Sequence, residues 1–169
     1  MKELNVEFGS IDSNNIEQLR KLNDAIFPIS YGPKFYDQVL AQPATLTKYT
    51  YYNGFVIGAI CTRLEDHPEE VGKKRAYVMT LGVLSSYRGR GVGEKMVQSV
   101  VNELSGKGEG AEEEYANVVD IYVHTQVSNV DAINFYCKNF EFEKGEVIKD
   151  YYKRIDPPDA ILLRKTLRE

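Results

Sequence analysis

The sequence has few of the side chains that form disulfides or bind metal ions. Its 169 residues include two cysteines, Cys61 and Cys137, and two histidines, His67 and His124. The cysteines do not form a CxxC pair, and structural zinc sites take their ligands from cysteine and histidine at short spacings. We therefore expect reduced, mostly structural thiols, no disulfide and no metal site.

The sequence also lacks long apolar runs and an excess of positive charge. No segment approaches the roughly 20 apolar residues that span a bilayer, and residues 1–10 lack the apolar core of a signal peptide. The 21 basic and 25 acidic side chains give a net charge of −4, whereas nucleic-acid affinity rests on an excess of lysine and arginine. We expect no membrane and no direct nucleic-acid partner, and a cytoplasmic location, with the nucleus left open as a second one.

What the sequence does contain is the pattern of one α/β domain. Apolar alternation predicts strands, and apolar residues at helical spacing predict helices. The predicted strands cover residues 4–8, 46–52, 55–63, 76–84, 117–124, 142–148 and 160–167, and the predicted helices cover residues 14–26, 34–40, 91–104 and 129–138. No internal repeat and no second domain is visible, so we expect a single domain over residues 1–169.

Short signals place the turns between these elements. Asn14, with Glu17 three residues later, predicts an N-terminal cap for the first helix. Asn53-Gly54 predicts a two-residue hairpin turn. Polar segments at 66–74 and 105–114 predict surface loops.

One strand–helix–strand unit predicts the centre of the sheet. Strand 76–84, helix 91–104 and strand 117–124 follow one another along the chain. Such a unit makes a right-handed crossover, so its two strands should lie parallel and adjacent. The sequence therefore predicts a mixed α/β sandwich.

A glycine-rich segment, YRGRGVG at 87–93, lies just before the third helix. A P-loop requires GxxxxGK[ST], but Gly93 is followed by Glu94, and a dinucleotide loop requires GxGxxG. The remaining pattern is RxxGxG, at Arg88, Gly91 and Gly93. Glycines there let backbone N–H groups wrap a diphosphate at a helix N-terminus. The alternative is a tight turn that uses glycine for its geometry alone.

This loop resembles the acetyl-CoA loop of the GNAT acyltransferase superfamily. Gly82 in the preceding TLGVL fits the bulge where GNAT strands separate, and SNVDAINFY at 128–136 resembles a second signature. The resemblance implies acetyl-CoA as co-substrate and an α/β GNAT fold. In that fold a mixed, mostly antiparallel seven-stranded sheet is splayed between two central parallel strands and flanked by about four helices. The implied cofactor-binding residues are Leu81, Val83, Arg88, Gly89, Arg90, Gly91, Val92, Gly93, Asn129 on the pantetheine arm, and Tyr136 as an acid near the sulfur.

Four segments resemble, more closely, the N-terminal acetyltransferases of the NatE type. They are IFPISY at 26–31, KRAYVMTLGVL at 74–84, IYVHTQVSN at 121–129 and YYKRIDPPDA at 151–160. The resemblance implies acetyl transfer to the α-amine of peptides that begin with methionine and a hydrophobic residue. It assigns Tyr77 and His124 to general-base work through an ordered water. The implied substrate-binding residues are Phe27, Pro28, Ile29, Tyr31, Met79, Tyr151, Tyr152 and Ile155.

The chemistry of these side chains agrees with acyl transfer to an amine. The pKa of an α-amine is about 7.7–8.0 against about 10.4 for lysine, so a modest base suffices for the former. His124, expected at the end of its strand, lies outside the polar loops, and backbone N–H groups at 81–83 could serve as oxyanion donors. A purely structural role is the alternative for each: His124 as a satisfied polar residue, Tyr77 and Met79 as core, and Tyr151-Tyr152 as edge-strand residues.

Two other functions remain open from the sequence. A GNAT enzyme could act on lysine side chains or polyamines, although a polyamine site should be lined with carboxylates. A GNAT fold could also serve as a low-activity partner subunit, but such a chain need not keep Tyr77 and His124. The resemblance implies the N-terminal peptide of nascent or mature proteins as a partner, and docking on the NatA complex at the ribosome.

Overall fold

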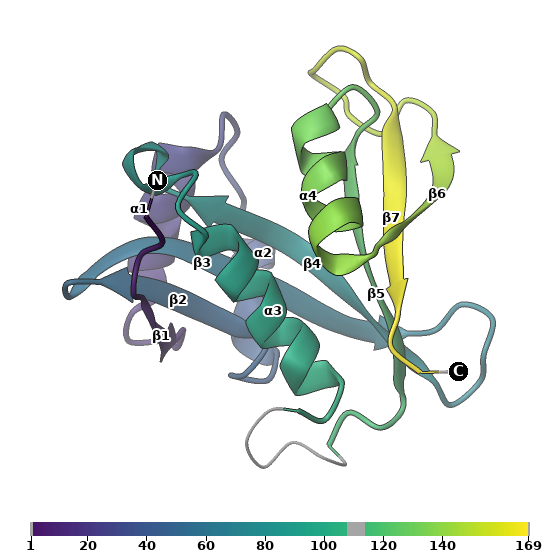
Figure 1. The fold of residues 1–169 in the computed structure, drawn as a ribbon, viewed down its shortest axis with the longest axis horizontal. Helices are drawn as coiled ribbons and strands as arrows, with labels where there is room; N and C mark the ends of the chain where they lie inside the picture. The colour runs from purple at the N-terminus through teal and green to yellow at the C-terminus, as the bar shows by residue number, and fades with distance from the viewer. Residues whose placement is uncertain (1, 108–113, 169) are drawn as a thin grey trace.

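Seven strands form one sheet in the computed structural model, which describes residues 2–107 and 114–168 (Figure 1). The strands are β1 (Glu7–Ser10), β2 (Thr47–Tyr52), β3 (Phe55–Asp66), β4 (Lys74–Val83), β5 (Val118–Gln126), β6 (Glu143–Ile148) and β7 (Ala160–Thr166). The helices are α1 (Ile16–Ile26), α2 (Pro33–Ala41), α3 (Val92–Leu104) and α4 (Val130–Phe140), with a 3-10 turn, η1, at Ser85–Tyr87. The predicted loop at 105–114 falls mainly on residues 108–113, which lie outside the described residues.

The strand order is β1-β2-β3-β4-β5-β7-β6, and β4 and β5 run parallel while the other neighbours pair antiparallel. The predicted parallel pair is therefore confirmed. Its pairing runs from Lys74 opposite Val118 to Tyr77 opposite Tyr122 and goes no further. Because β4 continues to Val83, the two strands separate beyond Tyr77.

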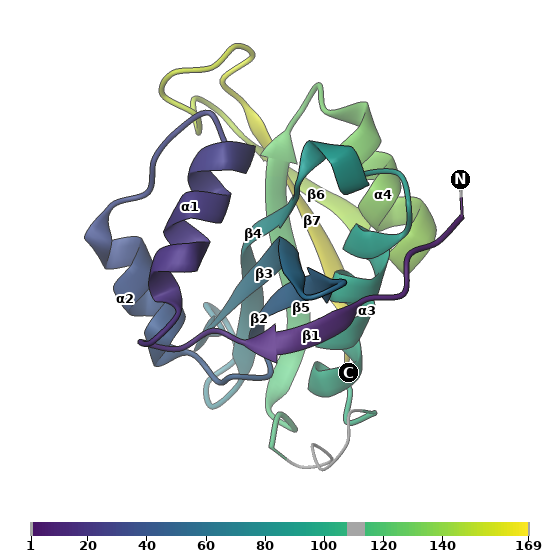
Figure 2. The same ribbon diagram turned by 90° about the vertical axis from the view of Figure 1, so that its left-hand side faces the viewer.

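Helices cover both faces of the sheet, so the molecule has two apolar cores. In Figure 2, α1 and α2 lie on one side of the sheet and α3 and α4 on the other. The core under α1 and α2 includes Leu19, Leu22, Tyr36, Val39, Tyr49, Ala59 and Cys61. The core under α3 and α4 includes Ile57, Ile60, Val78, Met96, Val97, Val100, Ile121 and Phe140. Apolar stripes at helical spacing produce this arrangement, since each amphipathic helix buries one face against the sheet.

The β3–β4 ladder contains a bulge at Met79. Cys61 pairs with Thr80 and the next residue, Thr62, pairs with Val78, so Met79 has no partner of its own on β3. An extra residue in one strand bends it and increases its local twist. The bulge therefore lies close to the point where β4 leaves β5.

The prediction that placed this bulge at Gly82 is wrong. Gly82 pairs in regular register with Ala59. A Cβ atom added to Gly82 would lie 3.0 Å from Phe27 Cζ and 3.1 Å from Ile26 Cδ1. Glycine at this position therefore serves the close approach of the end of α1.

The first strand begins later than the predicted range of 4–8. Leu4 donates its backbone N–H to Arg90 O at 3.3 Å, so this part of the chain runs beside the glycine loop instead of along β2. Pairing with β2 begins at Glu7, opposite Tyr51. A contact with a distant loop thus takes the place of the expected strand.

The predicted cap of the first helix is also wrong. Asn15, not Asn14, is the N-cap residue of α1, and its side chain makes no capping hydrogen bond. It instead accepts the Asp12 N–H at 2.9 Å, while Asp12 Oδ1 accepts the Asn14 N–H at 2.8 Å. A turn closed by aspartate and asparagine side chains therefore precedes the helix.

The hairpin turn at Asn53-Gly54 is confirmed. Both residues have positive φ, 48° and 79°, as a type I′ turn requires. Among residues 2–107 and 114–168, no helix is long and apolar enough to cross a membrane. The same residues contain no group of three or more His, Cys, Asp or Glu side chains that could hold a metal ion.

Candidate active site

The separated ends of β4 and β5 open into a cavity of about 1040 Å³. Every residue predicted for the site except Arg90 lines it. The predicted cofactor residues in its wall are Leu81, Val83, Arg88, Gly89, Gly91, Val92, Gly93, Asn129 and Tyr136. The predicted catalytic and substrate residues in its wall are Phe27, Pro28, Ile29, Tyr31, Tyr77, Met79, His124, Tyr151, Tyr152 and Ile155. Segments that lie far apart in the sequence therefore meet in one continuous space.

The glycine loop has the backbone geometry of an anion cradle. Gly89 and Gly91 have φ values of 74° and 80°, which residues with side chains rarely adopt. Gly91 is the N-cap of α3, so the unpaired N–H groups of the first helical turn follow it directly. A Cβ atom on Gly93 would lie 3.5 Å from the Phe135 ring. This loop fits a pyrophosphate, because donors and the positive end of the helix dipole coincide.

The two arginines of the loop have different surroundings. Arg88 Nε donates to Val83 O at 2.9 Å, and both residues line the cavity. Arg90 Nε donates to Lys2 O at 3.1 Å, so its side chain is directed to the N-terminal segment. Arg90 is not among the residues of the cavity wall.

Two backbone N–H groups of β4 are directed into the gap between β4 and β5. Leu84 donates its N–H to Ile57 O of β3 at 2.8 Å. In an antiparallel ladder successive residues direct their N–H groups to opposite sides. The N–H groups of Leu81 and Val83 therefore face away from β3, where β5 no longer pairs with β4.

Helix α4 brings Asn129 and Tyr136 to the cavity. Asn129 Oδ1 accepts the Ala132 N–H at 3.1 Å and caps the helix, which leaves the amide NH₂ of Asn129 available to a ligand. Tyr136 is buried, and burial raises the pKa of its phenol well above the usual range. Tyr136 is therefore a protonated donor at neutral pH.

Tyr77 and His124 form a hydrogen-bonded pair in the cavity wall. The Tyr77 hydroxyl lies 3.2 Å from His124 Nδ1 and 3.3 Å from the Tyr151 hydroxyl. His124 lies within β5, two residues before its last residue Gln126, and not at the end of the strand as predicted. Tyr77 pairs with Tyr122 in the β4–β5 register, and His124 lies two residues further along β5 on the same face. This register brings Tyr77 and His124 together.

The surroundings of the pair favour different protonation states. Burial, together with the hydrogen bond to Tyr151, raises the pKa of Tyr77 far above its usual range. Burial, with a contribution from the Arg75 charge, lowers the pKa of His124 below its ordinary value of 6.5. Near neutral pH the phenol therefore keeps its proton, and the imidazole has a free lone pair with which to accept one.

Aromatic side chains build the other part of the cavity. The Phe27 and Tyr31 rings meet edge-on with centroids 5.9 Å apart, and Tyr151 and Tyr152 meet edge-on at 4.9 Å. Within the described residues, Glu94 at the start of α3 is the one carboxylate of the cavity wall. A polyamine, which needs several carboxylates, does not fit this wall, whereas an apolar side chain does.

Sequence reasoning missed three residues beside the pair. The Tyr122 ring contacts the rings of both Tyr77 and His124, and Glu65 and Arg75 contact Tyr122. Tyr122 could have been found, because it lies two residues before His124 and so shares its face of the strand. Glu65 and Arg75 carried no signal beyond their charge. The wall also includes Val78, Thr80, Tyr87, Val123, Thr125, Gln126, Ala132 and Phe135, which were not predicted.

Known proteins that are similar to this chain are acetyltransferases. The model of the acetyltransferase (GNAT) family matches residues 16–142. N-alpha-acetyltransferase 50 of Danio rerio is 45% identical over 163 residues, which cover 96% of this chain and 89% of the relative. A probable N-acetyltransferase san of Drosophila melanogaster is 42% identical over 168 residues, covering 99% of this chain and 84% of that protein.

A solved structure agrees with these relatives. It is Arabidopsis thaliana Naa50 in complex with the bisubstrate analogue CoA-Ac-MVNAL, which is 39% identical and superposes with a TM-score of 0.81. The match covers 95% of this chain and 97% of the plant chain. The resemblance drawn from the sequence is thereby confirmed. The chain belongs to the GNAT acetyltransferase family and, within it, to the N-alpha-acetyltransferases of the NatE type, whose acetyl donor is acetyl-CoA.

Proposed function

We propose that this enzyme acetylates the α-amine of peptides that begin with methionine and a hydrophobic residue. The observation that carries the proposal is the single cavity, which joins the glycine loop to the aromatic wall with the Tyr77–His124 pair lining it. Acetyl-CoA, when bound, supplies an acetyl group activated as a thioester. The glycine loop, Arg88 and the amide of Asn129 would hold its diphosphate and pantetheine parts.

In this proposal His124 accepts the proton of the attacking amine through an ordered water. Its lowered pKa keeps the imidazole unprotonated at neutral pH, as a base must be. Tyr77 keeps its own proton, because its pKa is raised, and its hydroxyl orients the imidazole and the water. The two residues therefore have different roles in one proton transfer.

On the donor side, the protein supplies hydrogen-bond donors fixed before the reaction. The N–H groups of Leu81 and Val83 face the gap between the strands and are placed to donate to an acyl oxygen. In this proposal Tyr136, buried on α4 and protonated because burial raises its pKa, donates a hydrogen bond to the departing sulfur and stabilises the charge that develops on it. Neither role requires a group to change its charge before the substrate binds.

The preference for methionine follows from the aromatic wall. An unbranched thioether side chain gains from burial against Phe27 and Met79, and a sulfur–aromatic contact with Phe27 adds to this. Exposed Ile29 and Ile155 lie at the rim, where a second apolar side chain can pack. The plant relative was solved with an analogue named CoA-Ac-MVNAL, in which valine follows methionine. This supports the same order of residues for the substrate of this chain.

The first test is the specificity of the enzyme for the first two residues of a peptide. Losing one large buried apolar side chain costs about 1.5–3 kcal/mol, so kcat/KM for Met-Leu should exceed that for Ser-Leu by roughly tenfold or more. Met-Glu should also react slowly, since its carboxylate would lose water without a partner. Equal kcat/KM values for all three peptides would contradict the proposal, and changes at the fifth residue provide the control.

The resemblance to NatE enzymes also supports a proposal about partners. We infer that the substrate is the N-terminus of nascent or mature proteins, presented in the cytoplasm, and that the chain docks on the NatA complex at the ribosome. Thiol release from acetyl-CoA by the isolated chain with a Met-Leu peptide tests whether docking is needed. No release would favour a low-activity partner subunit instead.

A further inference from the structure

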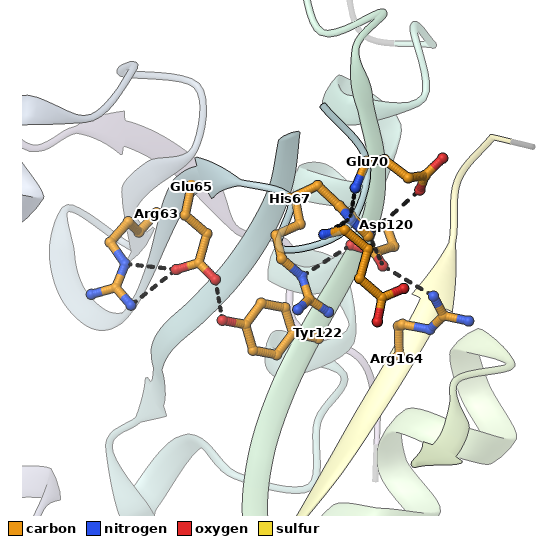
Figure 3. A network of polar contacts seen from close by, with 9 residues as sticks. Arg63, Glu65, His67, Glu70, Asp120, Tyr122 and Arg164 are labelled. Atoms are coloured by element: carbon orange, nitrogen blue, oxygen red, sulfur yellow. Dashed lines mark hydrogen bonds and ion pairs between the residues drawn. The ribbon is translucent and has the colours of Figure 1, made fainter. Parts of the chain in front are cut away.

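Charged side chains contact Tyr122, whose ring packs against the Tyr77–His124 pair. Figure 3 shows Tyr122 with Glu65 and Arg63. The Tyr122 hydroxyl donates a hydrogen bond to Glu65 Oε1. Glu65 Oε2 in turn accepts from Arg63, at 3.2 Å from Nε and 3.1 Å from the terminal nitrogen. The hydroxyl of Tyr122 is therefore tied to a carboxylate that is itself held in place.

The ring of Tyr122 contacts both members of the catalytic pair. Its centroid lies 4.7 Å from that of Tyr77 and 5.6 Å from that of His124, while the Tyr77 and His124 rings lie 5.4 Å apart. The three rings thus pack against one another on one face of β4 and β5. A rotation of Tyr122 would have to move at least one of the other two.

Arg75 covers the other side of Tyr122. Its guanidinium carbon lies 3.8 Å from the centroid of the Tyr122 ring, the distance of a close cation–π contact. Arg75 Nε also donates to Asp120 Oδ1 at 3.3 Å. Asp120 is buried and accepts a second bond from Arg164 at 3.2 Å, as Figure 3 shows. The guanidinium is therefore fixed by a buried anion at one end and by the ring at the other.

The β3–β4 ladder offers an internal comparison. Glu65 is paired in register with Arg75, and the next pair along the same two strands is Asp66 with Lys74. Lys74 and Asp66 form a surface ion pair at 3.0 Å, with the Asp66 side chain 91% exposed. The Arg75 side chain is only 14% exposed. Two adjacent cross-strand pairs thus carry the same charges, but Glu65 and Arg75 contact Tyr122 and their own ion-pair partners Arg63 and Asp120, whereas Lys74 and Asp66 pair with each other at the surface.

We propose that Tyr122, held between Glu65 and Arg75, is a positioning residue that fixes the Tyr77 and His124 rings for proton transfer. The proposal rests on the function proposed above, in which His124 is the base. Arg75 then has two effects. It fixes the Tyr122 ring by stacking, and its positive charge disfavours a second positive charge on His124.

The charges around His124 support the second effect. Arg75 on β4 lowers the pKa of His124, while Glu65 on β3 and Glu146 on β6 raise it. His124 also contacts the Tyr77 hydroxyl and the rings of Tyr151 and Tyr122. Removal of the Arg75 charge should therefore raise the pKa of His124 and leave more of it protonated at a given pH.

Four substitutions separate stacking from charge. Tyr122→Phe keeps the ring and removes the hydroxyl, and Glu65→Gln removes the charge that holds it. Arg75→Gln removes the cation, whereas Arg75→Lys keeps the charge but loses the planar group. Lys74→Gln and Asp66→Asn, in the neighbouring surface pair, are the matched controls.

The measurements are kcat, kcat/KM against pH with one Met-Leu peptide, acetyl-CoA affinity and thermal stability. Tyr122→Phe and Glu65→Gln should lower kcat roughly tenfold with unchanged acetyl-CoA affinity, because small misplacements of reacting groups cost up to about 10²-fold. Arg75→Gln should shift the acid limb of kcat/KM to higher pH. Arg75→Lys keeps the positive charge, so its acid limb should stay at the wild-type pH, but kcat should fall because the stacked guanidinium is lost. Lys74→Gln and Asp66→Asn should leave both kcat and the acid limb unchanged.

Opposite results separate this inference from the proposed function. Wild-type kcat in Tyr122→Phe, which keeps the volume of the core and should fold, would overturn the positioning role. An unmoved acid limb in Arg75→Gln would overturn the charge effect. If His124→Ala is fully active, the part of the proposed function that makes His124 the base fails. If His124→Ala is inactive while the other variants behave as wild type, only the positioning role fails.

Discussion

At the scale of single residues, two neighbours in the cavity wall favour opposite protonation behaviour, which is the basis of the proposed proton transfer. Tyr77 and His124 hydrogen bond at 3.2 Å, yet burial moves their pKa values in opposite directions. A buried phenol resists losing its proton, and a buried imidazole resists gaining one. The pair therefore provides one donor and one acceptor at neutral pH.

Substitution of either residue should reduce the rate and leave cofactor binding intact. Tyr77→Phe and His124→Ala are each expected to lower kcat by about 10²–10⁴-fold, the usual contribution of general-base catalysis. The double variant should be far less than additive if both act on one water. Steady-state kinetics and calorimetry with acetyl-CoA check this.

A second tyrosine provides the control for the loss of a hydroxyl. The Tyr115 hydroxyl bonds Thr45 Oγ1 at 2.7 Å, and neither residue lines the cavity. Tyr115→Phe should therefore keep wild-type kcat. Full activity in His124→Ala would show that the imidazole is a structural residue and not the base.

At the scale of elements, the glycine loop combines a strained backbone with a helix N-terminus. Gly91 has a φ of 80° and is followed by α3. A Cβ atom there would lie 3.4 Å from Glu3 Cγ, so the N-terminal segment packs against the loop. Only a residue without a side chain keeps this backbone open to an anion.

Gly91→Asp should therefore abolish acetyl-CoA binding, because it adds bulk and negative charge at the anion site. Gly72→Asp is a matched control, since Gly72 also has a φ of 80° but has open space around its Cβ position. Both variants put a side chain on a backbone with positive φ, so both are strained. Only Gly91→Asp should lose acetyl-CoA affinity, as measured by calorimetry. Near-normal affinity in a folded Gly91→Asp protein would remove this loop from the cofactor site.

Elements with local signals were predictable from the sequence. The stripe of apolar residues in α3 and the turn at Asn53-Gly54 depend on neighbours within a few positions, and both are confirmed. The start of β1 was not predictable, because the Leu4 N–H donates to the carbonyl of Arg90, a residue far away in the sequence. The role of Gly82 was wrongly predicted for the same reason, because the glycine makes room for the end of α1, which is distant in the sequence.

At the scale of the whole molecule, the site exists because two parallel strands pair and then separate. Pairing of β4 with β5 stops at Tyr77, so the cavity opens between their ends, and the Tyr77–His124 pair lines it. Most residues of its wall could be predicted from resemblance to a family. The contact of Glu65 and Arg75 with Tyr122 could not, because it depends on the strand register.

The central claim is that the acetyl group goes to the α-amine. The most direct measurement uses one peptide that begins with Met-Leu, has a free α-amine and carries one internal lysine, incubated with the enzyme and acetyl-CoA. Tandem mass spectrometry of the early product then locates the acetyl group. We expect the acetyl group on the methionine nitrogen. The α-amine loses its proton near pH 8, about two pH units below lysine, and the methionine side chain packs against the aromatic wall. Acetyl on the lysine side chain at an equal or greater rate would contradict it.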